Sequence, residues 1–144
     1  MRRVKADPSL LRPAARSFYD PIYQINYCVV ISDREDYLPT LKKSLTGWVT
    51  RSAAKEILTK SDHDMTDCNG RCIRLPSLRL DEAIADVIVI WLRAGADVAV
   101  LAHEAWHALM WVFDRRGMDA SLATEEAVAH YLQWIVRSAL GVRT

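Results

Sequence analysis

The apolar residues of this chain fall into short runs and helical stripes. Residues 26–31 are apolar and rich in β-branched side chains, which predicts a buried strand. Residues 37–45 carry leucines at helical spacing, preceded by Asp33 as a candidate N-cap and followed by Gly47 as a candidate helix end. The pattern therefore predicts a strand followed by a helix, while residues 48–60 fit either a short helix or a strand.

The middle of the chain contains a turn signal and an ambiguous apolar stretch. Asn69-Gly70 is a strong hairpin signal, and residues 71–75 are predicted to leave that turn as a strand that Pro76 stops. Residues 80–92 combine strand composition toward their end with a helical stripe, so both structures stay open there. We favour a helical turn over 81–85 followed by a strand.

The two ends of the chain differ in character. Residues 1–24 contain three prolines and are predicted to form an irregular arm. Near the other end, a helix is predicted from Asp97 to about residue 114, and Ser121 or Thr124 begins a last helix. Residues 97–141 are thus expected to form an antiparallel helix pair joined by a short polar loop.

These elements predict an α+β fold in a single domain over residues 1–144, in which a short β-sheet packs on one helix and on an antiparallel C-terminal helix. The net charge is only +1, which disfavours nucleic acid and anionic membranes as partners. The longest apolar stretch is too short to cross a bilayer, and no apolar signal segment follows the basic start. A cytoplasmic location is therefore expected, whereas the oligomeric state is not predicted.

The predicted helix after Asp97 contains the sequence His103-Glu104-Ala105-Trp106-His107. Two histidines four residues apart project from one face of a helix, about one turn apart, so both can bind one metal ion. The carboxylate beside the first histidine can then act as general base on a metal-bound water. This motif predicts a zinc hydrolase, with peptidase as the favoured activity.

A catalytic zinc ion normally has three protein ligands and a water molecule, so a third ligand is needed. The candidates are Glu125, Glu126 and His130, all on the predicted last helix. Glu126 shares a polar stripe with His130. Glu125 lies on an apolar stripe, where a buried carboxylate would need a partner such as a metal ion. The residues alone leave this choice open.

The motif followed by Glu126 resembles the gluzincin pattern of zinc peptidases, and residues 101–136 are similar to small metallopeptidases encoded by phages and prophages. The resemblance implies a zincin-like fold, a protein or peptide substrate, and a place in the cytoplasm of a bacterial host. It implies His103, His107 and Glu126 as zinc ligands, with Glu104 as general base.

One position departs from the family pattern. His130 stands where thermolysin-like members have an aspartate that supports a ligand histidine, so His130 is a candidate to orient Glu126, to contact the substrate or to bind the metal. Tyr131 is a second candidate for an electrophile beside the substrate. In zincin folds an edge strand binds the extended substrate, and residues 87–92 are expected to fill that role.

Other interpretations of the sequence remain. Cys68 and Cys72, with His63 upstream, resemble a second zinc site, but a hairpin at Asn69-Gly70 would explain this segment without metal by placing the cysteines across from each other. Trp106 is expected in the core. Finally, the whole chain fits a non-catalytic, metal-stabilised interaction module that acts in phage particle assembly.

Overall fold

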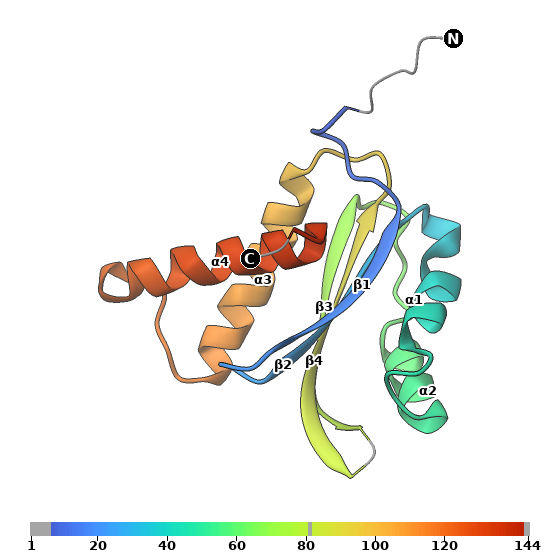
Figure 1. Cartoon of the computed structure of the whole chain (residues 1–144), viewed down its shortest axis with the longest axis horizontal. Coiled ribbons are helices and arrows are strands. Elements are labelled where there is room, and N and C mark those ends of the chain that lie inside the picture. Colours follow the sequence, from blue (N-terminus) through green and yellow to red (C-terminus); the bar gives the residue numbers. More distant parts are fainter. Residues whose placement is uncertain (1–6, 81, 143–144) are drawn as a thin grey trace.

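The computed structural model describes residues 7–80 and 82–142, which fold around one four-stranded mixed sheet (Figure 1). The strands are β1 (Ala14–Asp20), β2 (Ile25–Ser32), β3 (Gly70–Leu80) and β4 (Ala83–Arg93), in the order β1-β2-β4-β3. β2 and β4 run parallel, and the other neighbouring strands are antiparallel. The predicted α+β class is confirmed.

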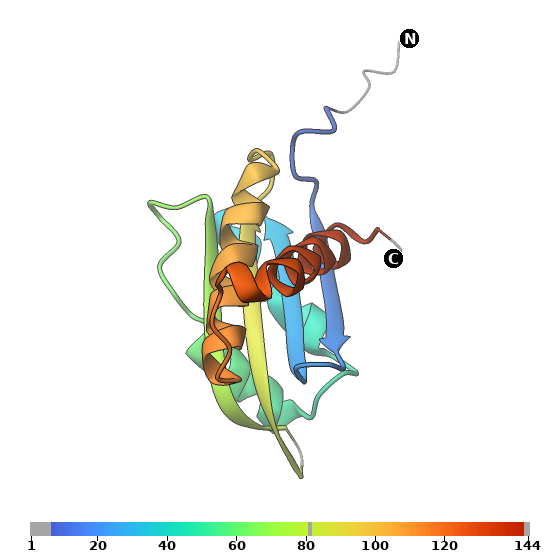
Figure 2. The same ribbon diagram turned by 90° about the vertical axis from the view of Figure 1, so that its left-hand side faces the viewer.

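Helices cover both faces of this sheet (Figures 1 and 2). α1 (Tyr37–Leu45) and α2 (Arg51–Lys60) lie on one face, and α3 (Ala99–Arg115) and α4 (Glu125–Leu140) lie on the other. Short 3-10 helices, Arg34–Asp36 and Leu122–Thr124, precede α1 and α4. Among the described helices, none combines the length and apolar character that a membrane span requires.

The ambiguous stretch after residue 80 is a strand. The helical turn predicted over 81–85 is wrong for its residues from Ala83 onward, which belong to β4; Asp81 lies outside the described residues. Residues 87–92 are all buried because helices cover both faces of β4. The two-residue alternation that marks a half-buried strand is therefore lost, and a helical stripe in the same residues is accidental.

The turn predicted at Asn69-Gly70 is also wrong. Gly70 is the first residue of β3 and pairs with Leu92, and β3 joins β4 at its other end. Pro76 does not stop the strand. β3 is an edge strand with a register shift after Leu75, and edge positions with a bulge tolerate the missing N–H of proline.

The N-terminal segment is more regular than predicted. Residues 1–6 lie outside the described residues, but Ala14–Asp20, within the range 1–24 that was expected to be irregular, form strand β1. Pro13 and Pro21 directly flank this strand, so the prolines mark its limits. Leu11 is buried, and its N–H donates to the carbonyl of Ala96 at 2.8 Å. The segment is thus tied to the sheet.

The helix predicted at 37–45 is confirmed as α1, and the starts predicted for α3 and α4 agree with the structure. Within residues 48–60, which fitted either a helix or a strand, Arg51–Lys60 form α2, whose first turn is capped by the Thr50 hydroxyl. The Asp97 carboxylate accepts the backbone N–H of Ala99 at 2.8 Å, at the start of α3. Ser121 and Thr124 form a reciprocal capping box before α4.

α3 and α4 cross at a steep angle, so the predicted antiparallel pair is wrong (Figure 1). The direction of α4 follows from its aromatic contacts with β1 and β2. Tyr131 is hydrogen-bonded to the hydroxyl of Tyr27, and the Trp134 ring meets Phe18 edge-on at 5.5 Å. α4 therefore lies across β1 and β2, and residues 125–130 are exposed or half-buried.

Candidate metal centre

His103 and His107 lie one turn apart on the exposed side of α3. Their Nε2 atoms are 3.1 Å apart, and their rings are nearly perpendicular. Two nitrogens bound to one tetrahedral zinc ion lie about 3.3 Å apart, because each Zn–N bond is about 2.0–2.1 Å long. The two ring nitrogens are hydrogen-bonded to each other here, and their spacing is close to that of two ligands of a single metal ion.

Glu104 turns from this exposed side toward the sheet. The residue is only 7% exposed, and its side chain packs against the start of β3 near Gly70. Burial raises the pKa of Glu104 above its usual value, while His107, His103 and the Cys72 N–H act in the opposite direction. A carboxylate with a raised pKa suits a base that accepts and returns a proton near neutral pH.

Gly70 lets α3 approach the start of β3 closely. A Cβ atom on Gly70 would lie 2.7 Å from Cγ1 of Val100 and 3.0 Å from Cγ of Glu104. Sequence analysis assigned this glycine to a turn and so missed the contact. A glycine at the beginning of a strand-like segment is a signal for such an approach, although a weak one.

Glu126, the predicted third ligand, lies apart from the histidine pair. Its carboxylate is 3.3 Å from Nε2 of His130, and the two side chains are 90% and 75% exposed. Glu125 is also exposed, so no buried charge there needs a metal ion. Within residues 7–80 and 82–142, no group of three or more His, Cys, Asp or Glu side chains has metal-binding geometry. The structure brings together two of the three predicted ligands.

The candidate second zinc site is also dispersed. Cys72 lies on β3, where burial raises the pKa of its thiol to about 12, whereas Cys68 lies in the loop before that strand. The predicted arrangement across a hairpin is wrong because no hairpin separates the two cysteines. His63 instead lies 3.2 Å from a guanidinium nitrogen of Arg71.

Several residues predicted to contact substrate or core lie elsewhere. Tyr131 is buried and donates its hydroxyl proton to Asp20 at 2.8 Å, so it does not reach the histidine pair. Residues 87–92 lie inside the sheet, and the edge strand beside α3 is β3. The role predicted for 87–92 is therefore wrong. Trp106 is exposed next to His107 and does not lie in the core.

Comparison with known protein families, with curated proteins and with solved structures found no match to this chain. The resemblance to zinc peptidases therefore stays a prediction from the motif. What the structure adds is the geometry of His103, Glu104 and His107 on one helix.

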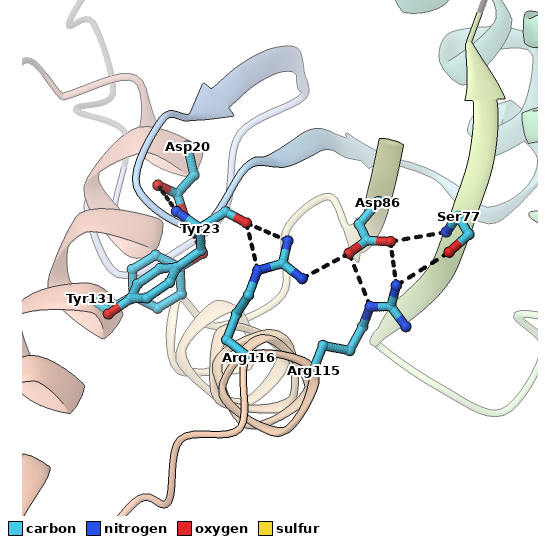
Figure 3. Close-up of polar contacts among 7 residues, drawn as sticks. All are labelled: Asp20, Tyr23, Ser77, Asp86, Arg115, Arg116 and Tyr131. Atoms are coloured by element: carbon cyan, nitrogen blue, oxygen red, sulfur yellow. Dashed lines mark hydrogen bonds and ion pairs between the residues drawn. The ribbon is translucent and has the colours of Figure 1, made fainter. Parts of the chain in front are cut away.

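A second polar cluster lies at the C-terminal end of α3 (Figure 3). Asp86 of β4 is buried, and Arg115 contacts both of its carboxylate oxygens, at 2.8 and 2.9 Å. Arg116 lies 3.3 Å from the same carboxylate and also donates to the carbonyl of Tyr23. The sequence gives no local signal for this cluster, because Asp86 and the arginines are about 30 positions apart.

The carboxylate of Asp86 has its pKa below the usual value. Burial by itself would raise this pKa, but hydrogen bonds from Arg115 and from the Ser77 N–H, together with the charges of both arginines, outweigh it. The cluster therefore holds an ionised carboxylate against the end of α3.

Proposed function

We propose that this chain is a zinc-dependent peptidase in which His103 and His107 hold the metal ion and Glu104 is the general base. The observation that carries the proposal is the arrangement of these three side chains on α3: two imidazole nitrogens at ligand spacing and a buried carboxylate of raised pKa. When bound, zinc supplies a water of lowered pKa and polarises the substrate carbonyl. The resemblance to gluzincins supports the same assignment.

Glu104 takes a proton from the attacking water and returns it to the leaving amine of the peptide. Its desolvated position makes the carboxylate a better proton acceptor than an exposed glutamate. Close packing against Gly70 at the start of β3 limits the movement of that side chain. Burial therefore supplies the basicity of Glu104.

Glu126 is the residue that we propose as third ligand, after a rearrangement of the first turns of α4. Residues 119–130 are exposed or half-buried, whereas α4 becomes buried only from Tyr131 onward. The ion pair between Glu126 and His130 is exposed, and exposed pairs contribute little to stability. A movement of this end of α4 toward α3 would therefore disturb little of the core, and His130 would follow as a candidate to orient Glu126.

The direct test of the enzyme is Glu104→Gln in zinc-loaded protein, assayed on a mixture of unstructured peptides by mass spectrometry. We expect this variant to keep the zinc content of the wild type and to lose about 10²–10⁴-fold in hydrolysis rate, because it lacks the base. Glu35→Gln, at an exposed glutamate on the other side of the sheet, is the matched control and should retain the rate. Wild-type hydrolysis by Glu104→Gln would refute the assignment.

Zinc content after dialysis tests the third ligand. Glu126→Ala should lower the bound zinc, while Glu125→Ala should not. The opposite result would transfer the ligand role to Glu125 and leave the histidine pair as it is.

One observation favours a non-catalytic interaction module instead. The histidine pair is exposed, and the described residues bring no third ligand to it, so side chains of a partner protein would be able to complete the coordination. For such a module, as in phage particle assembly, zinc would promote association with the partner, and Glu104→Gln would leave that association unchanged.

A further inference from the structure

A pocket of about 410 Å³ opens beside the arginine cluster, at the end of the sheet away from the histidine pair. Its walls come from the connection between β1 and β2, from the first residues of β4 and from the end of α3. The lining includes Gln24, Ser77, Ile84, Asp86, Arg115 and Arg116. β2 pairs with β4 only from Asp86 onward, so the start of β4 has no strand beside it on this side.

The charges in this pocket do not balance. Arg115 and Arg116 both face Asp86, which is the only acidic residue among those that line the pocket. Two guanidinium groups against one carboxylate leave a net positive charge. Both arginine side chains are partly exposed, so this charge is accessible from solvent.

Arg115 also has a guanidinium nitrogen to spare, whereas each nitrogen of Arg116 already has a partner in Asp86 or the Tyr23 carbonyl. A guanidinium group has five N–H bonds. Arg115 directs Nε and Nη2 to Asp86 and to the Ser77 hydroxyl, and its Nη1 has no hydrogen-bond partner among the residues that the structure describes. The ring of Trp111 lies 5.2 Å from this guanidinium and limits its movement. The donors are therefore held in place before any ligand binds.

The backbone of the pocket is unusual at two positions. Gln24 has φ +58° and Ser77 has φ +52°, and they are the non-glycine residues with positive φ in the described part of the chain. Residues that carry a side chain rarely adopt this backbone conformation, and strained residues of this kind cluster at binding sites. Both line this one pocket, at opposite walls.

We propose that this pocket is an anion-binding site in which Arg115 and Arg116 bind a carboxylate or a phosphate group. Guanidinium groups recognise both anions through paired N–H donors, and Asp86 fixes the orientation of the two arginines (Figure 3). Arg115 follows His107 by eight positions on α3, about 12 Å along the helix. The site is therefore separate from the histidine pair and needs no zinc.

The test is a titration of the ¹⁵N-labelled full chain with sodium phosphate and, separately, with sodium acetate, while sodium chloride keeps the ionic strength constant. We expect saturable shifts of the backbone amides of Gln24, Ile84 and Arg116, with a dissociation constant of about 1 mM or lower for the better anion. Tighter binding of phosphate identifies a phosphorylated ligand, and tighter binding of acetate identifies a carboxylate of a polypeptide. Shifts that stay linear with both anions would overturn the proposal.

Arg116→Gln is the informative variant because Arg115 makes the closer pair with the buried Asp86, which would be left unpaired. We expect Arg116→Gln to weaken binding about tenfold. Arg12→Gln removes the same charge at the opposite end of the sheet and should leave affinity unchanged. Equal weakening in both variants would show non-specific attraction and reject the site. If Arg116→Gln does not fold, the wild-type shift map decides: saturable shifts confined to the pocket support the site, and any other pattern rejects it.

Discussion

At the scale of the residue, Glu104 links the paired histidines of the candidate metal centre to the edge strand β3. Its carboxylate is buried against β3. The paired histidines are its neighbours on α3, with His103 directly before it and His107 three positions after it. Burial raises its pKa, and positive charge on His107 or His103 lowers it. A cation bound by the histidines would act in the same direction as their own protonation. The proton affinity of Glu104 therefore depends on whether the histidine pair is protonated or binds a cation.

The raised pKa of Glu104 predicts how stability depends on pH in metal-free protein. The folded state holds this proton more tightly than the unfolded chain, whose pKa is near 4.5. The stabilisation is complete below that pH and is lost as the pH rises through the folded-state pKa. Glu104→Gln, which does not titrate, should therefore gain stability relative to the wild type as the pH rises from about 4.5 to the folded-state pKa, and the difference should stay constant above it.

Urea unfolding at a series of pH values measures this difference. The free energies of unfolding of wild type and Glu104→Gln should diverge with increasing pH, while Glu35→Gln, at an exposed position, should track the wild type. A difference between Glu104→Gln and wild type that is the same at every pH would contradict the raised pKa.

Gly70 makes a second prediction at this scale. Gly70→Ala places a Cβ atom 2.7 Å from Val100 Cγ1, which should lower the free energy of unfolding by about 1–3 kcal/mol. Val100→Ala removes the clashing methyl groups, so in the double variant part of this loss should be recovered. Chemical denaturation of the single and double variants measures the coupling. Strictly additive losses would mean that the contact with Val100 is not the cause of the destabilisation in Gly70→Ala.

At the scale of the element, the sequence was informative wherever one segment alone decides the structure. The buried strand at 26–31, the helix at 37–45 and the caps of α3 and α4 follow from local composition and periodicity. Strands whose pattern depends on the elements packed around them were harder to predict from the sequence. β4 lost its alternation because helices cover both faces, and β3 continues past Pro76 because it lies at an edge.

The direction of α4 depends on contacts that local patterns do not contain. Tyr131 and Tyr27, whose hydroxyls meet in the core, are 104 positions apart in the chain. The His-Glu-x-x-His motif therefore predicted the paired histidines on α3, while the position of Glu126 depended on how α4 crosses β1 and β2. This is why the two histidines were correctly expected on one helix face, while Glu126 was not brought to them.

The buried network under α4 predicts an effect on stability. Asp20 accepts N–H bonds from Ile22 and Tyr23 and the hydroxyl of Tyr131 at 2.8 Å. Tyr131→Phe removes one donor from this buried carboxylate and should cost about 1–3 kcal/mol in the free energy of unfolding. Tyr19→Phe removes the same atom from an exposed ring on β1 and should cost almost nothing. Similar losses in the two variants, by urea denaturation, would contradict the role of the network.

At the scale of the whole molecule, α3 connects two separate polar sites. Its first half carries the histidine pair and contacts the start of β3 through Glu104. Its last residues, Arg115 and Arg116, hold Asp86 of β4 and the turn before β2. Both proposed sites therefore depend on how one helix is positioned over the sheet, although the ligands proposed for them have opposite charge.

The measurement that tests the central proposal most directly is anomalous diffraction at the zinc absorption edge, from crystals of the full chain grown with zinc. We expect one strong peak about 2.0–2.1 Å from Nε2 of both His103 and His107, with a carboxylate of α4 completing the protein ligands. A crystal in which zinc is bound elsewhere, or in which the two imidazoles contact no metal ion, would contradict the proposal.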